Sequence, residues 1–214
     1  MRLAIFDFDG TIYRKETFTL LMHHLKTTYP KKYRRFFATI LPVYIGYKLK
    51  IITEKNMKAK LMESYMKSLK DLTESELDAY FTDIAHEMKD DFNQSVVKRL
   101  QEHKQAGDYT MILSGAFTPL LYAVDQQLKL ECDAILGTEI PRPDHPFIHI
   151  HAEQKPVLLY NYLESVDINW DSSSAYGDSI ADLSVLEMVG HPIAVCPDKP
   201  LNQIAEKQNW EIML

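Results

Sequence analysis

Two aspartates two positions apart, Asp7 and Asp9, follow an apolar run at residues 3–6 near the start of the chain. Side chains alternate along a strand, so both carboxylates share one face if the strand continues through them. Gly10 lets the backbone turn directly afterwards, which places both acids at the rim of a sheet. Because carboxylates this close repel each other, the pattern indicates a cation between them or a proton on one of them. The alternative interpretation is a solvated turn after an edge strand.

A second acidic pair, Asp178 and Asp182, lies in the segment Gly-Asp-Ser-Ile-Ala-Asp at 177–182. Asp178 follows an apolar strand, at the end where open α/β sheets bind ligands. Asp182 comes one helical turn later on the same side. The alternative is a capping acid and a surface acid, which is less favoured because this pair repeats the strand-end placement of Asp7 and Asp9. Three or four converging carboxylate oxygens favour a hard cation, most naturally Mg²⁺.

Ser114 and Lys155 could bind an anion. Ser114 and Gly115 end an apolar strand expected at 109–113, where a hydroxyl and free backbone N–H groups suit a phosphate oxygen. An ordinary loop is the alternative. Lys155 opens a helix expected at 156–164, although a cation there opposes the helix dipole. That placement indicates an anionic partner, the alternative being a solvent-exposed lysine.

The elements that must position these residues change in character along the chain. The strand expected at 2–7 is apolar on both sides, which is typical of a central strand in a parallel sheet. An all-helical block follows, with helices expected at 16–28, 31–41, 54–68 and 73–89. After residue 92 the α/β alternation returns. We expect helices at 93–106, 118–128 and 156–164, strands at 109–113, 133–136, 174–176, 193–195 and 210–212, and a hairpin at 137–151.

Composition and charge limit the classes of function. The 214 residues are 46% hydrophobic and 25% charged, which is typical of a globular protein, and the net charge of −6 argues against a general nucleic-acid binder. Cys132 and Cys196 lie far apart and are expected to be thiols. The N-terminal residues lack the apolar core of a signal peptide, so we expect a cytoplasmic location. The sequence makes no prediction of oligomeric state.

Three further patterns have ordinary explanations beside functional ones. The uncharged run at 36–47 is too short for a membrane span, and a buried core helix that Pro42 and Gly46 bend or break is favoured over an interfacial one. The methionine-rich stripe at 57–69 is expected to be core packing rather than a ligand surface. His149 and His151 are expected to be solvated hairpin residues, the alternative being a transition-metal site.

Four motifs in fixed order resemble those of the haloacid dehalogenase-like superfamily of phosphohydrolases. They are "DFDGT" at 7–11, "LSG" at 113–115, Lys155, and "GDSIAD" at 177–182. The helical block resembles the cap of the phosphoserine-phosphatase-like branch. The resemblance implies a doubly wound, mostly parallel Rossmann-like sheet with an inserted all-helical cap. It divides the chain into a core domain of residues 1–13 and 92–214 and a cap domain of residues 14–91.

The resemblance also implies roles for individual residues. Asp7 would be the nucleophile and a metal ligand, Asp9 the general acid and base with its backbone carbonyl on the metal, and Asp178 a metal ligand. The remaining roles are phosphate binding by Gly10, Thr11, Ser114, Gly115 and Lys155, support by Ser179 and Asp182, and contact with the substrate by Glu16 and Thr17.

The acid at position 9 indicates which of the superfamily's reactions this chain would catalyse. Release of halide needs no proton donor, so a second acid favours hydrolysis of a phosphate ester. The resemblance therefore implies a Mg²⁺-dependent phosphatase acting on a small phosphomonoester, with no nucleic-acid partner and without membrane association. Phosphoserine is not favoured, because residues 30–60 lack a clear arginine-containing substrate segment. The alternatives are phosphoryl transfer to an acceptor other than water, a non-catalytic ligand-binding protein, and a lipid phosphate reached through the apolar cap run.

Overall fold

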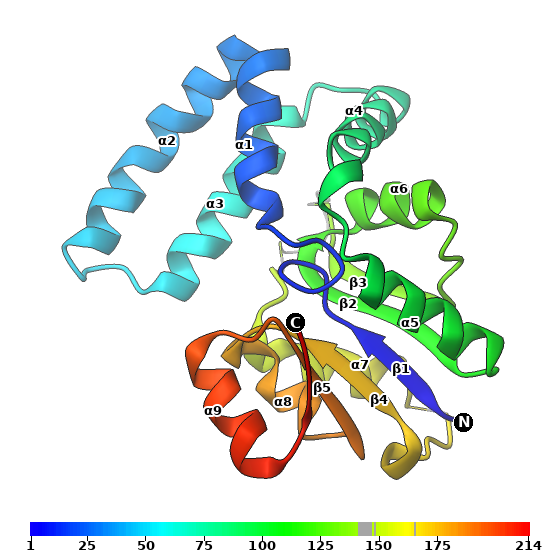
Figure 1. Cartoon of the computed structure of the whole chain (residues 1–214). Coiled ribbons are helices and arrows are strands. Elements are labelled where there is room, and N and C mark those ends of the chain that lie inside the picture. The colour runs from blue at the N-terminus through cyan, green and yellow to red at the C-terminus, as the bar shows by residue number, and fades with distance from the viewer. Residues whose placement is uncertain (141–146, 148, 165) are drawn as a thin grey trace.

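A six-stranded parallel sheet forms the centre of the chain in our computed structural model, which describes residues 1–140, 147, 149–164 and 166–214 (Figure 1). The strands run in the order β3-β2-β1-β4-β5-β6, and every neighbouring pair is parallel. This order reverses between β1 and β4, where open α/β sheets bind ligands. The strands are β1 (Leu3–Phe6), β2 (Tyr109–Phe117), β3 (Ala134–Thr138), β4 (Ser174–Gly177), β5 (His191–Val195) and β6 (Glu211–Met213).

Helices cover both faces of the sheet, as a doubly wound fold requires. The side chains of β1 alternate, so Ala4 and Phe6 pack with α5 (Gln94–Gln105) and α6 (Thr118–Leu128). Leu3 and Ile5 pack on the other face with α7 (Lys155–Tyr162), α8 (Leu183–Leu186) and α9 (Lys199–Gln208). The predicted fold class is therefore confirmed. Short 3-10 turns are η1 (Lys89–Asp91), η2 (Ala152–Gln154), η3 (Trp170–Ser172) and η4 (Ile180–Asp182).

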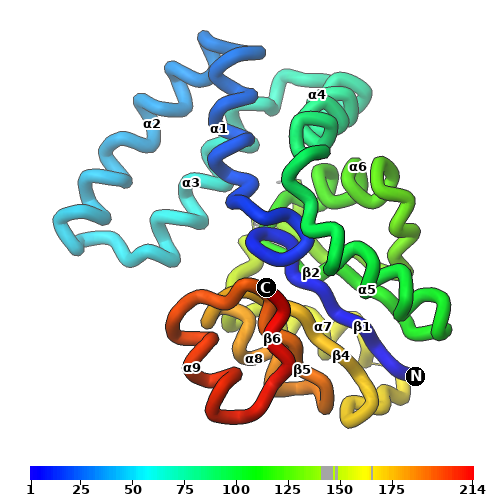
Figure 2. Tube along the Cα trace, in the orientation of Figure 1, coloured from blue at the N-terminus to red at the C-terminus, as the bar shows by residue number. Residues whose placement is uncertain are grey.

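Four helices between β1 and α5 form the insertion. They are α1 (Thr17–Thr28), α2 (Pro30–Lys48), α3 (Glu54–Leu69) and α4 (Glu74–Glu87). The predicted N-caps are present: Thr53 accepts from Asn56 N–H at 3.3 Å, and Thr73 with Glu76 forms a capping box. Figure 2 shows the trace of the insertion beyond the carboxyl ends of β1 and β4.

The two chain crossings into and out of the insertion lie side by side. Arg14 N–H donates to the Asp91 carbonyl at 3.0 Å, Asn93 N–H donates to the Ile12 carbonyl at 2.8 Å, and Tyr13 forms a bridge with Phe92. The chain therefore enters and leaves the insertion at neighbouring points, and the domain boundaries at 13/14 and 91/92 stay a prediction.

Helix α2 differs from its prediction. It continues through Pro42 and Gly46 instead of ending near residue 41. Phe36 and Ile40 pack in the core, and Gly46 lies so close to Ile52 that an added Cβ would be 2.8 Å from Ile52 Cδ1. Tertiary packing therefore outweighs the local cost of proline and glycine. Among the described residues, no helix is long and apolar enough to cross a membrane.

Two predictions around β2 and β3 are also revised. Strand β2 extends to Phe117 rather than residue 113, because its pairing with β3 resumes after a register shift between Leu113 and Phe117. The predicted hairpin turn, Pro141 to Pro146, lies outside the described residues. Residues 147 and 149–151 form no strand, so the predicted returning strand is wrong for them. Ile150 N–H instead donates to Thr138 Oγ1 at 3.2 Å.

Candidate active site

Asp7 and Asp178 meet at the point where the strand order reverses. Asp7 directly follows β1 and Asp178 directly follows β4, and Asp7 N–H donates to the Tyr176 carbonyl at 2.9 Å. Asp7, Asp178 and Asp182 each offer a carboxylate oxygen, and these oxygens all lie within 4.8 Å of one another. Three of the four acids in the two predicted pairs therefore converge, whereas the Asp9 carboxylate is not part of this cluster.

Gly10 brings the loop after β1 against Asp178. Its φ is +74°, and a Cβ there would lie 2.2 Å from Asp178 Oδ2. Only glycine combines this conformation with such a close approach. Thr11 is fully buried and its hydroxyl has no partner among the described residues, so its side chain shapes the loop rather than facing the cleft.

We predict that Gly10→Ala weakens divalent-metal binding by about 10- to 100-fold, because the added methyl group displaces the Asp178 carboxylate. Isothermal titration with Mg²⁺ measures this loss. Gly107→Ala is the matched control, since Gly107 has a φ of +76° but open space around its Cβ position. Equal metal affinity in the two variants would show that the close approach at Gly10 is unimportant.

Asp9 is held at both oxygens by the first residue of α1. Thr17 N–H donates to Asp9 Oδ1 at 2.8 Å and Thr17 Oγ1 donates to Asp9 Oδ2 at 3.0 Å. Burial raises the pKa of Asp9 to about 7; the two Thr17 hydrogen bonds oppose this shift and the Glu16 charge adds to it. Asp9 can therefore hold or release a proton near neutral pH. Thr17, expected to contact the substrate, positions this acid.

Lys155 is a buried counterion. Its Nζ donates to Asp7 Oδ1 at 2.5 Å and to Asp182 Oδ1 at 2.6 Å. Burial lowers the pKa of Lys155, but the two carboxylates together more than offset this and keep it above its usual range. On the other side, Asp182 Oδ2 accepts from Ser179 N–H at 3.3 Å. The position of a lysine at a helix start is thus explained by two buried acids.

Negative charge at the site exceeds this one ammonium group. Four aspartates, Asp7, Asp9, Asp178 and Asp182, surround Lys155, and Asp178 forms no ion pair with any described residue. Burial raises the pKa of Asp178 to about 7, with Asp182 and Glu16 adding to the rise. Oxygen ligands with uncompensated charge fit a hard divalent cation.

The raised pKa values give a stability prediction. Asp9 and Asp178 have folded-state pKa values near 7 against about 3.9 in an unfolded chain, so folding takes up protons between these values. The free energy of unfolding of the metal-free protein should therefore fall on the order of a few kcal/mol from pH 4 to pH 7. Urea unfolding with and without Mg²⁺ tests this: Mg²⁺ should stabilise the protein more at pH 8 than at pH 5, and a pH-independent effect would contradict it.

A cleft of about 450 Å³ lies between these aspartates and the insertion. Ser114 and Gly115 line it, and the Ser114 hydroxyl accepts from Ala116 N–H at 3.1 Å. His149 and His151 also line it, which corrects their expected solvated positions; burial lowers the pKa of His149 to about 4 and keeps the ring neutral.

The lining residues that sequence reasoning missed as site residues come mainly from α1 and α3: Phe18, Thr19, Met57, Lys58, Leu61 and Met62.

The methionine-rich stripe on α3 therefore has two functions. Tyr65 and Met66 are buried in the core, as expected, whereas Met57 and Leu61 face the cleft and Met62 contributes to both. Helical spacing alone cannot tell a core face from a cleft wall.

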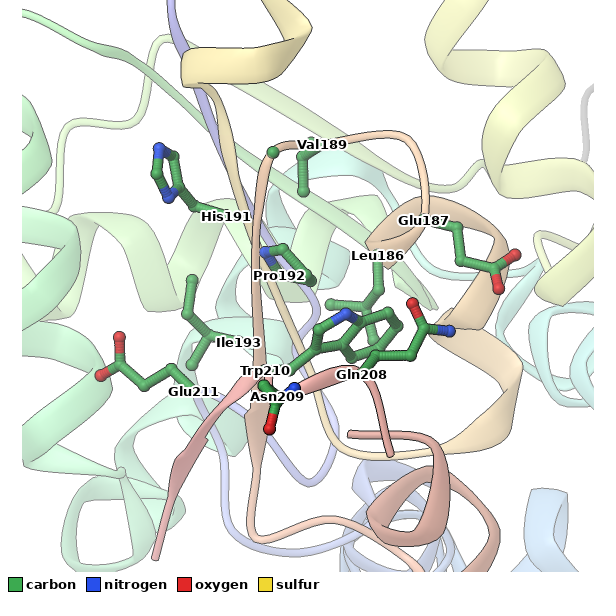
Figure 3. Close-up of a pocket in the computed structure, with 11 residues that line it drawn as sticks. Leu186, Glu187, Val189, His191, Pro192, Ile193, Gln208, Asn209, Trp210 and Glu211 are labelled. Carbon is green, nitrogen blue, oxygen red and sulfur yellow. The ribbon is translucent and has the colours of Figure 1, made fainter. Parts of the chain in front are cut away.

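A second cavity of about 390 Å³ lies at the opposite edge of the sheet, where β5 and β6 begin (Figure 3). His191, Trp210 and Glu211 line it. It is away from the carboxyl ends of the strands, where α/β sheets bind ligands, so the cleft beside Asp7 is the candidate active site.

Comparison with known proteins agrees with this geometry. A sequence model described as haloacid dehalogenase-like hydrolase matches residues 4–187. The chain belongs to this family. Over 118 residues it is 27% identical to "Phosphoserine phosphatase SerB1" of Mycobacterium tuberculosis, a match covering 52% of this chain and 38% of that protein. The match to "Putative hydrolase ML2424" of Mycobacterium leprae covers 39% of that protein, so the chain spans about two-fifths of the length of these relatives.

Solved structures share the fold. A protein of unknown function from Bordetella pertussis Tohama I is 20% identical with a TM-score of 0.80, covering 100% of this chain and 98% of that one. A phosphoserine phosphatase in apo form is 17% identical with a TM-score of 0.62, covering 100% of this chain and 92% of its own. At these identities the likeness shows a common fold and no more.

Proposed function

We propose that this protein is a Mg²⁺-dependent phosphatase that hydrolyses a small phosphomonoester through an aspartyl-phosphate on Asp7. The observation that carries the proposal is the state of the Asp7 carboxylate. Lys155 holds Oδ1, while Oδ2 accepts no hydrogen bond from any described residue. An oriented but unbonded oxygen is available to attack phosphorus. The family membership and the fold shared with phosphoserine phosphatases support the same reaction class.

In the first step, Asp7 Oδ2 bonds to phosphorus while the bond from phosphorus to the ester oxygen breaks. Asp9 gives its proton to the departing oxygen, so the alcohol leaves neutral. A pKa of about 7 keeps a protonated fraction of Asp9 available at neutral pH.

In the second step, the ionised Asp9 takes a proton from water, whose oxygen attacks the phosphorus of the aspartyl-phosphate. The bond from phosphorus to Asp7 Oδ2 breaks, inorganic phosphate leaves, and both aspartates return to their starting states. The two hydrogen bonds from Thr17 keep Asp9 in one orientation for both proton transfers.

The proposed metal ligands are the carboxylates of Asp7 and Asp178 and the backbone carbonyl of Asp9. Bound Mg²⁺ would neutralise charge on the transferring phosphoryl group. The remaining phosphate contacts are assigned to Ser114, Gly115, Lys155 and the backbone around Gly10 and Thr11, with Ser179 and Asp182 holding Lys155 in place.

The cleft wall bears on the class of substrate. Within the described ranges, Lys58 and Lys155 are the lysines that line it and no arginine does. Lys155 is committed to two aspartates and Lys58 pairs with Glu54 at 2.9 Å. Phe18 and Met57 add apolar surface. These residues favour an ester whose alcohol carries apolar carbon over one that carries a carboxylate, such as phosphoserine.

Release of inorganic phosphate tests the proposed function. The purified protein should release phosphate from p-nitrophenyl phosphate and from members of a phosphorylated-metabolite panel with Mg²⁺, and chelation by EDTA should stop it. Labelled phosphate appearing on an added alcohol instead would show a phosphotransferase. Ligand binding without turnover of any ester would show a non-catalytic protein, and either result would overturn the proposal.

A further inference from the structure

Helix α2 presents apolar side chains to solvent. It packs on α1 and α3 and lies at the outer edge of the molecule, away from the sheet (Figure 1). Phe36 and Ile40 point inward and are buried. The opposite side and the turn that follows α2 expose six large apolar residues, of which Leu49 and Ile51 are 65% and 76% exposed: Phe37, Leu41, Tyr44, Ile45, Leu49 and Ile51. We call these residues, with the basic residues at both ends, the α2 surface.

The charge around this surface is one-sided. From Thr17 to Thr53 the sequence contains seven lysines and arginines and no aspartate or glutamate. The net charge of the whole chain is −6, so the chain outside residues 17–53 has a net charge of −13. The exposed basic residues of the α2 surface are Lys31, Arg34 and Arg35 at one end and Lys48 and Lys50 at the other. None of these five forms an ion pair with a described residue.

We propose that the α2 surface binds an anionic lipid bilayer. A helix with a central apolar stripe and cations at its ends matches a helix lying in the plane of a membrane interface, with aliphatic side chains below the headgroups and ammonium and guanidinium groups at the phosphates. Its 19 residues span about 28 Å, so the whole length can lie on the surface. No helix among the described residues can cross a bilayer, which agrees with binding on the surface.

Charge argues against a second copy of the chain as the occupant. A symmetric dimer through this surface would bring its five unpaired cations against the same five on the partner. Anionic headgroups supply the opposite charge, and the acyl chains beneath them bury the apolar stripe. The proposal does not depend on catalysis. Helix α2 packs on α3, and Met57 and Leu61 of α3 line the cleft.

Vesicle flotation of the full chain tests the proposal. Wild-type protein should float with vesicles of phosphatidylcholine and phosphatidylglycerol but not with phosphatidylcholine alone, and added salt should weaken binding. Leu41→Ser with Ile45→Ser should lower vesicle affinity at least about tenfold. Lys48→Gln with Lys50→Gln should lower it about fivefold per charge.

Two double variants outside the α2 surface serve as matched controls. Val157→Ser with Tyr160→Ser removes exposed apolar residues from α7, and Lys199→Gln with Lys207→Gln removes exposed charges from α9. Both should bind vesicles like the wild type, and circular dichroism checks the fold of every variant. Absence of wild-type flotation, equal losses in controls and test variants, or a dimer in ultracentrifugation that only the α2 variants abolish would overturn the proposal.

Discussion

Asp7→Asn should lower phosphate release by at least about 10⁴-fold in kcat, because an amide oxygen is too weak a nucleophile to form the aspartyl-phosphate. The substitution is nearly isosteric, and the amide oxygen can still accept the hydrogen bond from Lys155 Nζ. Loss of activity would therefore be chemical rather than structural. Steady-state kinetics with p-nitrophenyl phosphate measure it, and circular dichroism checks the fold.

Asp9→Asn provides the contrast that separates nucleophile from proton donor. It should slow hydrolysis of an alkyl phosphate much more than that of p-nitrophenyl phosphate, whose leaving group needs little protonation. Asp7→Asn should slow both equally. Mass spectrometry of acid-quenched wild-type protein should find the phosphoryl group on Asp7. Activity of Asp7→Asn within tenfold of the wild type, or a phosphoryl group on another residue, would contradict the mechanism.

The positions of the site residues could be predicted because they follow strand ends. Strand β1 is apolar on both sides, and parallel strands bring their carboxyl ends to one edge, so Asp7 and Asp178 were expected at the same edge; their closeness follows from the pairing of β1 with β4. The helix predicted at 118–128 has the observed bounds of α6. Such inferences need only the alternation of side chains along a strand and the order of the elements along the chain.

Other features depend on contacts between distant segments. The burial of Lys155 depends on Asp7 and Asp182 lying on either side of its ammonium group, and helix-dipole reasoning alone indicated only an anionic partner. The extension of β2 depends on renewed pairing with β3. The prediction of a buried core helix at 36–47 is wrong for one side of α2, because exposed apolar residues 37, 41, 44 and 45 occur with buried ones in a single uncharged run. Tertiary structure decides each case, not local propensity.

Lys155→Met should destabilise the metal-free protein by roughly 3–5 kcal/mol, because it leaves the Asp7 and Asp182 carboxylates buried without a partner. Urea unfolding in EDTA measures the loss. Lys15→Met is the matched control: Lys15 pairs with Asp91 at 2.7 Å on the surface, and its removal should cost at most about 1 kcal/mol. Equal losses in the two variants would show that burial of the Lys155 pair has no special importance.

Protonation and charge removal should both rescue this variant. Burial raises the pKa of Asp7, so its unpaired carboxylate binds a proton more readily at pH 5 and Lys155→Met should lose less stability there than at pH 8. Adding Asp182→Asn removes one of the two buried, unpaired negative charges and should restore part of the stability. Phosphate release should stay low, since the Lys155 ammonium group that would bind the phosphate is still missing. A double variant no more stable than Lys155→Met would mean that the lysine acts by packing alone. Recovery of stability without activity would instead assign Lys155 two separable functions: it neutralises the buried acids in the resting protein and holds the phosphoryl group during turnover.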